Sequence, residues 1–179
     1  MTATAKKRIT LGVAKIEYGE VLATGAMQTA LTQTSNTYRD SVTFAPEDGD
    51  TSSFFIEEND FPLETITSAG QWVVDWDILT PTTTEMAAFM GGTEDLTGNA
   101  PAWKAPTESA NIEKAIKITP KKGYILAFPK AQIQAKMTGG YKKGEPVLLH
   151  VRAIAETPFN ANNEPQPQVI MTDVTTQGA

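Results

Sequence analysis

Residues 112–137, IEKAIKITPKKGYILAFPKAQIQAKM, decide the fold class of this chain. The runs 112–118 and 131–137 each alternate apolar with polar or small residues, which places one face of a strand on a core and the other in solvent. Lys121-Lys122-Gly123 between them is typical of a turn, and Pro129 predicts a break in the second strand. The stretch therefore predicts antiparallel β-structure.

Strands are also predicted on both sides of this stretch. Residues 9–18 read as a first strand with Ile9, Leu11 and Val13 on its inner face, and residues 147–155 read as a closing strand. Residues 66–79 contain another strand. Its inner face is predicted to be Trp72, Val74, Trp76 and Ile78, and its outer face Val73, Asp75 and Asp77.

A projecting arm is predicted at residues 38–58. Two β-prone runs, 38–45 and 52–58, flank Pro46-Glu47-Asp48-Gly49-Asp50, and Asp-Gly between such runs is a strong hairpin signal. Few residues of this hairpin look like core residues, so we expect it to stand away from the rest of the protein.

One helix is predicted, at residues 82–90, with Thr80 as N-cap, Pro81 in the first turn and Gly91-Gly92 as its end. The polar, Thr-rich residues 23–37 read as a flexible loop, and residues 158–179 as a loosely ordered C-terminal tail. The sum is a single, mainly β domain over residues 1–179. It is a β-sandwich or barrel with one flanking α-helix, a projecting β-hairpin arm and extended termini.

Composition limits the possible functions. The 179 residues carry a net charge of −6 and no cysteine, so disulfides, thiolate nucleophiles and cysteine-bound zinc are excluded. An acidic chain is not expected to grip nucleic acid. Lys6, Lys7 and Arg8 precede no long apolar run, so neither a signal peptide nor a membrane helix is expected. We therefore expect assembly in a cytoplasm and no membrane insertion.

No catalytic or cofactor site is expected. His150 is the single histidine, and no Gly-x-Ser-x-Gly motif is present. Gly139–Gly144 has the spacing of a phosphate loop, but Glu145 stands where the lysine of that motif should be, and no helix is predicted to follow. The carboxylate pairs Asp48/Asp50 and Asp75/Asp77 read as a turn and as the wet face of a strand rather than as metal ligands. We predict that the protein is not an enzyme and needs no cofactor or metal.

Charge is sorted along the chain in a way that favours contact between copies. Residues 41–113 contain fourteen acidic residues and one basic residue, whereas residues 114–152 contain nine basic residues and one acidic residue. A monomer gains little from this arrangement, but copies stacked head-to-tail gain two complementary surfaces. The alternative is that these are solvated loops of opposite sign that never meet.

Three stretches resemble the major tail tube proteins of tailed bacteriophages. They are LGVAKIEYG at 11–19, MAAFMGGT at 86–93 and IKITPKKGYILAFPKAQI at 116–133, the last followed by a Lys-rich turn and the strand region 145–158. The resemblance covers most of the chain in order, at the level of pattern.

The resemblance implies a β-sandwich with a flanking helix that closes into hexameric rings. Rings stack head-to-tail into a hollow tube in the virion, through which DNA passes without specific binding. A tape-measure protein would set the tube length, and tail terminator and initiator proteins would be further partners. The hairpin at 38–58 resembles the arm that such proteins use between rings.

Two sets of site residues follow. The candidate ring-stacking interface sets the acidic Glu47, Asp48 and Asp50 of the arm against Lys121, Lys122, Lys142 or Lys143 of the next ring. The channel wall should be hydrophilic, and two faces are candidates for it. One is formed by Gln132, Gln134 and Lys136, and the other by Asp75 and Asp77.

Other functions remain open from the sequence. The tube protein of a contractile injection system would share the fold. A tail terminator or head–tail connector would form single rings. A carbohydrate-binding or adhesive β-sandwich would need exposed aromatic residues, whereas Trp72 and Trp76 read as core.

Overall fold

A computed structural model describes residues 9–173 of the chain. The elements in chain order are β1 (Leu11–Gly19), β2 (Thr32–Gln33), β3 (Thr43–Pro46), β4 (Thr51–Ile56), β5 (Asn59–Thr67), β6 (Trp72–Ile78), α1 (Thr83–Met90), β7 (Thr93–Asp95), β8 (Ala102–Lys104), β9 (Ile112–Lys122), β10 (Tyr124–Thr138), β11 (Leu148–Ala155) and β12 (Ile170–Asp173). Over this part of the chain, the predicted mainly β fold with one helix is confirmed.

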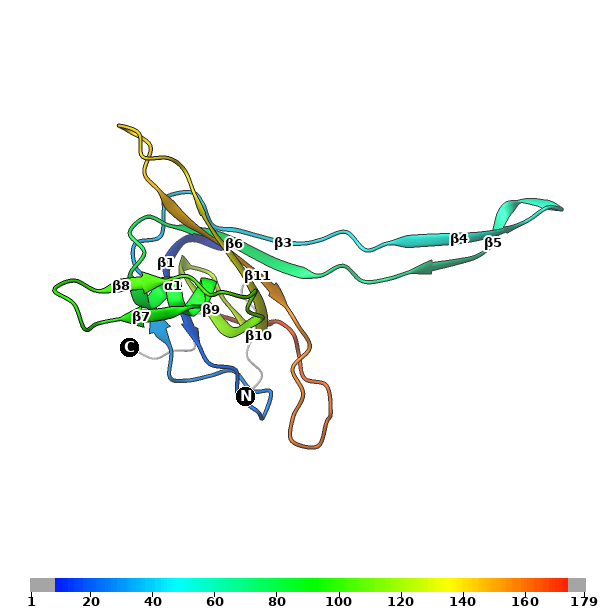
Figure 1. Ribbon diagram of the computed structural model, residues 1–179. Coiled ribbons are helices and arrows are strands. Elements are labelled where there is room, and N and C mark those ends of the chain that lie inside the picture. The colour runs from blue at the N-terminus through cyan, green and yellow to red at the C-terminus, as the bar shows by residue number, and fades with distance from the viewer. Residues whose placement is uncertain (1–8, 174–179) are drawn as a thin grey trace.

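One antiparallel sheet dominates the structure. Its strands follow the order β2-β1-β9-β10-β11-β6-β3, and β12 lies beside the first part of β10. The hairpins β4–β5 and β7–β8 are separate from this sheet. Figure 1 shows the curled sheet with α1 beside it and the β4–β5 hairpin reaching far out into solvent.

The core lies on the inner face of the curled sheet. Val74, Trp76 and Ile78 of β6 are fully buried there, as the alternating pattern predicts. Phe89 of α1 packs between Trp76 and Tyr18, with ring centroids 6.0 and 4.7 Å away. Full burial of each large apolar side chain contributes about 1.5–3 kcal/mol, so this face is the main source of stability.

Residues 34–37, the last part of the predicted flexible loop 23–37, join the two ends of the sheet together with Tyr38. The Thr34 N–H donates to the Ile16 carbonyl of β1 at 2.9 Å, and the Tyr38 N–H donates to the Asp77 carbonyl of β6 at 2.7 Å. The prediction was wrong because polar residues can also satisfy buried backbone and carboxylate groups. The segment therefore closes one end of the curl.

A buried carboxylate holds this segment to α1. Glu85, only 3% exposed, accepts hydrogen bonds from the Ser35 N–H and hydroxyl at 2.5 and 2.7 Å. It also accepts from the Thr82 N–H at 2.8 Å, completing a capping box. The N-cap is thus Thr82 rather than the predicted Thr80, while the predicted end at Gly91 is confirmed. Burial and then the Glu85 charge raise the pKa of Tyr18.

The arm projects as predicted, but its turn lies elsewhere. β3 pairs with β6, and β4 pairs with β5, so the chain reverses between Ile56 and Asn59 rather than at Asp48-Gly49. Gly49 serves a different purpose. A Cβ there would lie 1.8 Å from the Ser68 carbonyl oxygen, so the two chains of the arm approach too closely for a side chain.

β10 runs through Pro129, where a break was predicted. On one edge, Tyr124–Ala127 pair with β12 and Ala131–Thr138 pair with β11. Pro129 lies between these two partners, where its missing N–H leaves no ladder bond unmade, and the register with β9 shifts at the same place. The proline marks a change of partner inside one strand.

Both ends of the described chain also differ from expectation. In β1 the register with β9 shifts between Val13 and Lys15, so Ile16 and Tyr18 are buried while the predicted Ile9 and Leu11 are exposed. In the expected loose tail, Pro158 is buried and Ile170–Asp173 form β12 against β10. The predicted tail also includes residues 174–179, which lie outside the described residues.

We predict that Glu85→Ala lowers the free energy of unfolding by roughly 2–4 kcal/mol, because it removes the helix cap and leaves the Ser35 and Thr82 donors unpaired. Urea unfolding followed by circular dichroism measures the change. Glu108→Ala, at an exposed position, is the matched control and should lie within about 0.5 kcal/mol of the parent protein. Equal effects of the two substitutions would show that Glu85 does not hold the segment.

Candidate functional site

The outer face of the sheet carries a continuous polar surface across β6, β11 and β10. Directly opposite residues share a face, and the register gives one row of Asp77, His150 and Lys136. The next row contains Asp75, Arg152 and Gln134. Gln132 follows on β10, opposite Glu113 of β9 on one side and Ile154 of β11 on the other. Ile154 and its partner Val73 end the polar surface on β11 and β6. We call this surface the polar face.

The polar face brings together all five residues proposed for the channel wall. In the sequence Asp75 and Asp77 on one strand, and Gln132, Gln134 and Lys136 on another, were alternatives. β11 lies between their strands and places both sets on the same side of the sheet. The two alternatives are therefore one surface. That this surface lines a channel remains a prediction.

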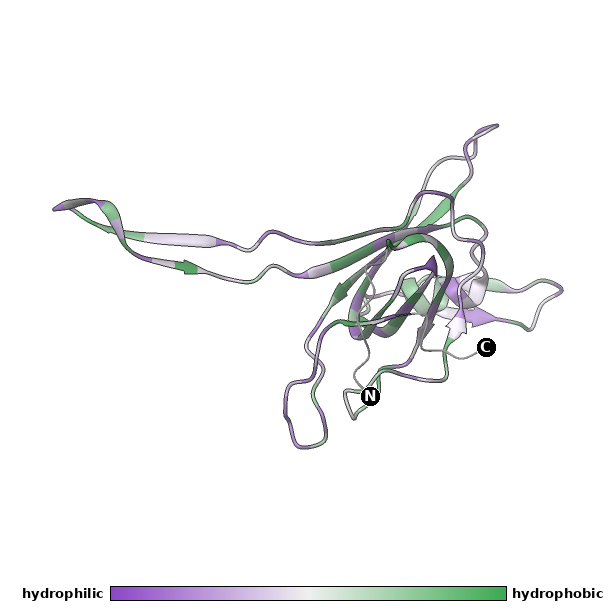
Figure 2. Ribbon diagram, turned by 180° about the vertical axis from the view of Figure 1, so that it is seen from behind, coloured by the Kyte–Doolittle hydropathy of each residue, from purple (hydrophilic) through white to green (hydrophobic). Residues whose placement is uncertain are grey.

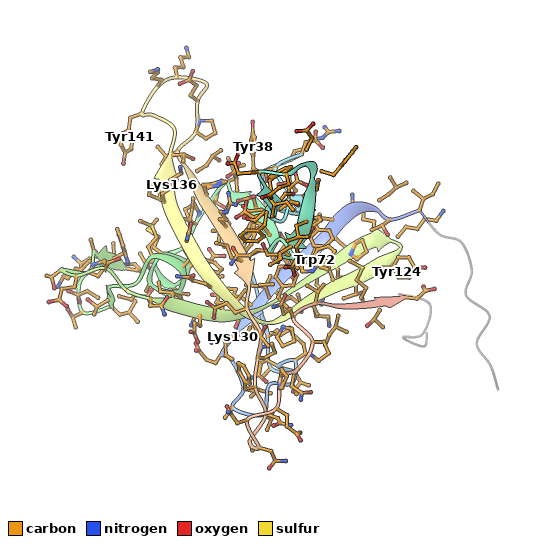
Figure 3. The ribbon with its side chains drawn as sticks, turned by 90° about the vertical axis from the view of Figure 1, so that its right-hand side faces the viewer. Tyr38, Trp72, Tyr124, Lys130, Lys136 and Tyr141 are labelled. Atoms are coloured by element: carbon orange, nitrogen blue, oxygen red, sulfur yellow. The ribbon has the colours of Figure 1, made fainter. Side chains whose placement is uncertain are left out.

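Ion pairs neutralise much of the polar face. Arg152 binds Glu47 at the base of the arm. Lys130 bridges Glu156 at 3.0 Å and Glu113 at 3.2 Å, and the Glu156 carboxylate is the main cause that raises the pKa of Lys130. Five carboxylates of this surface thus face three permanent cations and one histidine. Figure 3 labels Lys130 and Lys136, which lie along β10.

His150 lies between two carboxylates. Its Nδ1 is 2.7 Å from Asp77 Oδ1, and its Nε2 is 3.7 Å from Asp75 Oδ1. A carboxylate can only accept, so Nδ1 must carry the proton of the neutral ring. Leu149 and Val151 point into the core, as expected from alternation. Sequence reasoning found His150 but missed this contact, because β6 and β11 are far apart in the chain.

The seven residues proposed for ring stacking do not form one surface within the chain. Glu47 is held by Arg152, and Asp48 and Asp50 lie along the arm rather than at its tip. Lys121 and Lys122 precede β10, whereas Lys142 and Lys143 follow it. They are separated by fifteen residues of strand, roughly 50 Å. A single acidic surface on a neighbour can therefore meet one lysine pair but not both.

The end of the arm is apolar and acidic. Phe54, Phe55, Ile56, Phe61 and Leu63 are all exposed there, Phe55 by 61% and Leu63 by 71%. Its charged residues, Glu57, Glu58, Asp60 and Glu64, are all acidic. Figure 2 shows green and purple segments mixed at this end. A two-stranded ribbon has no second layer to cover such side chains, and contiguous exposed apolar surface marks an interaction site. We call residues 54–64 the arm tip.

Sequence reasoning missed the arm tip as a functional surface. The signal was present in two short apolar runs, Phe54-Phe55-Ile56 and Phe61-Pro62-Leu63, separated by acidic turn residues. Because Asp48-Gly49 was predicted as the turn of the hairpin, the arm was predicted to end at residue 58, and the second run was not assigned to it.

No family model matches the chain, and no curated protein matches it. Within residues 9–173, no group of three or more His, Cys, Asp or Glu side chains is placed to hold a metal ion. In the same residues, no helix is long and apolar enough to cross a membrane. The features of the molecule that bear on function are therefore the polar face, the arm tip and the edges of the sheet.

We predict that the neutral His150 ring is the Nδ1–H tautomer. Long-range ¹H–¹⁵N correlation spectra report this directly, and the assignment is unambiguous because the chain has one histidine. Asp77→Ala removes the acceptor and should abolish the preference, whereas Asp48→Ala, outside the polar face, should leave it unchanged. A neutral ring protonated on Nε2 in the parent protein would show that the Asp77 contact does not order the imidazole.

Proposed function

We propose that this protein is the structural subunit of a bacteriophage tail tube, which assembles as hexameric rings stacked head-to-tail into a hollow conduit for genome delivery. The observation that carries the proposal is the arm tip, whose large apolar side chains project far from the core. Another molecule must cover this surface to remove it from water, and a surface on one end of a molecule that meets a different surface on the next generates an open, repeating assembly.

The edges of the sheet support self-assembly as well. β2 and β3 end the strand order, and β12 adds a further edge beside β10. Unpaired strand edges offer backbone donors and acceptors to another copy, and ring closure through these edges would satisfy them. The ring symmetry and the virion setting come from the resemblance of 11–19, 86–93 and 116–133 to tail tube proteins.

The polar face suits the wall of a channel. Its charges are paired with each other within the sheet, so a passing DNA strand meets few unpaired cations. We propose that this face lines the lumen, with DNA, a tape-measure protein and the terminator and initiator proteins as partners. The role of an adhesive sugar-binding module finds less support, because Trp76 is fully buried and Trp72 is half-buried against Phe44.

Purified protein at high concentration should form hollow tubes or six-fold rings, observed by negative-stain electron microscopy with light scattering on the same sample. Phe55→Ser with Leu63→Ser should raise the concentration needed for assembly at least tenfold, since about 1.4 kcal/mol lost per contact is a factor of ten. Leu96→Ser, at a 67% exposed position beyond β7, is the control. A protein that stays monomeric under all conditions and lacks any effect of the arm variant would contradict the proposal.

Removing carboxylates from the polar face should make the assembled protein retain DNA. Asp75→Asn with Asp77→Asn removes the excess of carboxylates over permanent cations on this face, from five against three to three against three. Binding of a short duplex should then appear at low salt and vanish as salt is raised. Fluorescence anisotropy measures this. Asp48→Asn with Asp50→Asn changes the net charge equally at the arm and should not bind. If both double variants retained DNA equally, the proposal that the polar face lines the lumen would be contradicted.

A further inference from the structure

An open groove separates the two ends of the curled sheet, at the end that residues 34–38 do not close. Its volume is about 1000 Å³. β1 forms one wall, and residues 38–44 leading into β3 form the other. The floor comes from β9, β10 and β12, through Ile118, Leu126 and Met171. Figure 3, which views the molecule from the side of the arm, labels Tyr38 and Tyr124, both of which line the groove.

Both walls end in strand edges without a strand partner. β2 covers only Glu17 and Tyr18 of β1. Among residues 9–173, no strand pairs with Leu11–Lys15 on the side away from β9, and none pairs with β3 on the side away from β6. A guest that is itself a β-ribbon can pair with such edges, as in strand addition.

The groove has both apolar and polar lining, and its net charge is basic. Tyr38, Phe44, Tyr124 and Met171 are exposed in it, Met171 by 52%. Of its four charged residues, Lys15, Arg39 and Lys121 are basic and Asp40 is acidic. Lys15 is paired with Glu17 at 2.8 Å, and Arg39 makes only an exposed contact with Asp40, so Arg39 and Lys121 are the cations that a guest can reach. The arm tip is acidic where the groove is basic, because four acidic residues surround its phenylalanines and Leu63. Like the groove, it also exposes large apolar side chains. Among residues 9–173, β4 and β5 form a two-stranded sheet to which no further strand is added.

We propose that the arm tip of one copy docks in this groove of a second copy. The tip covers the apolar floor, its carboxylates face the basic rim, and its strands extend the open edges of β1 and β3. The contact is heterologous, so each copy uses its tip on one neighbour and its groove on another. The inference rests on the proposed function only in requiring self-association, and it identifies the surface that receives the arm.

The absence of cysteines allows a direct test by disulfide trapping. One copy carries Leu63→Cys, and a second, size-tagged copy carries Met171→Cys. The two are mixed under mild oxidation, and mixed dimers are separated on a non-reducing gel. Docking brings the two positions within the short Cβ separation that a disulfide needs. The mixed dimer should form at least tenfold faster than from the matched pair Leu96→Cys and Met171→Cys, since Leu96 is as exposed as Leu63.

Charge reversal on one copy and compensation on the other give a second test, because a folding defect in one copy would not be rescued by a charge change in the other. Lys121→Glu on the Met171→Cys copy should slow trapping, and Glu57→Lys with Glu58→Lys on the Leu63→Cys copy should restore it. Lys143→Glu, in the loop between β10 and β11, should have no effect. Loss of trapping without rescue would overturn the charge-matched docking.

Other occupants are distinguishable outcomes. Faster trapping of Leu63→Cys by Tyr141→Cys than by Met171→Cys would move the receptor to the β10–β11 loop, and trapping between Thr4→Cys and Met171→Cys within one chain would assign the groove to the protein's own N-terminal residues. Tubes in the microscope without 63–171 trapping would overturn this inference alone. Trapping in dimers or open chains that never form rings or tubes would overturn the proposed function alone.

Discussion

The structure depends on the backbone pairing of β10. This strand pairs with β9 along one edge and with β12 and then β11 along the other, so it lies at the centre of the sheet and holds the C-terminal strands to the rest of it. The change of partner at Pro129 needs a residue that offers no N–H, and proline meets that need without an unpaired donor. Both the inner apolar face and the outer polar face inherit their geometry from this strand.

The alternation of apolar and polar residues predicted where most of the long strands lie. Alternation identified β6, β9, β10 and β11 and most of their buried residues, because a period of two leaves one face dry whatever the strand pairs with. It was wrong at Val73, which is buried on the predicted outer face of β6, and at Met137, which is exposed on the predicted inner face of β10. It failed at β1, where a register shift changes the buried face, and at Asp48-Gly49, where the glycine serves close chain approach rather than a turn. These features depend on which strands meet, and the local sequence does not contain that information.

The candidate site shows the same limit. Asp75, Asp77, Gln132, Gln134 and Lys136 were each recognised as outward-facing, but their union required β11 as the strand between them. Arg152 and Lys130 could not be assigned from sequence, because their partners Glu47, Glu113 and Glu156 come from other elements. Some of the acidic residues of 41–113 therefore pair with basic residues of 114–152 in the same molecule rather than with another copy.

The acidic residues of the arm tip also decide what the arm does not bind. Two arms laid edge to edge would bring Glu57, Glu58, Asp60 and Glu64 against their own copies, and like charges on paired strands are destabilising. Carboxylates beside exposed phenylalanines therefore disfavour edge-to-edge pairing of two arms, as charged residues beside aggregation-prone strands do in general. The charge of the apolar arm tip thus disfavours pairing with another arm tip but not binding to a basic surface.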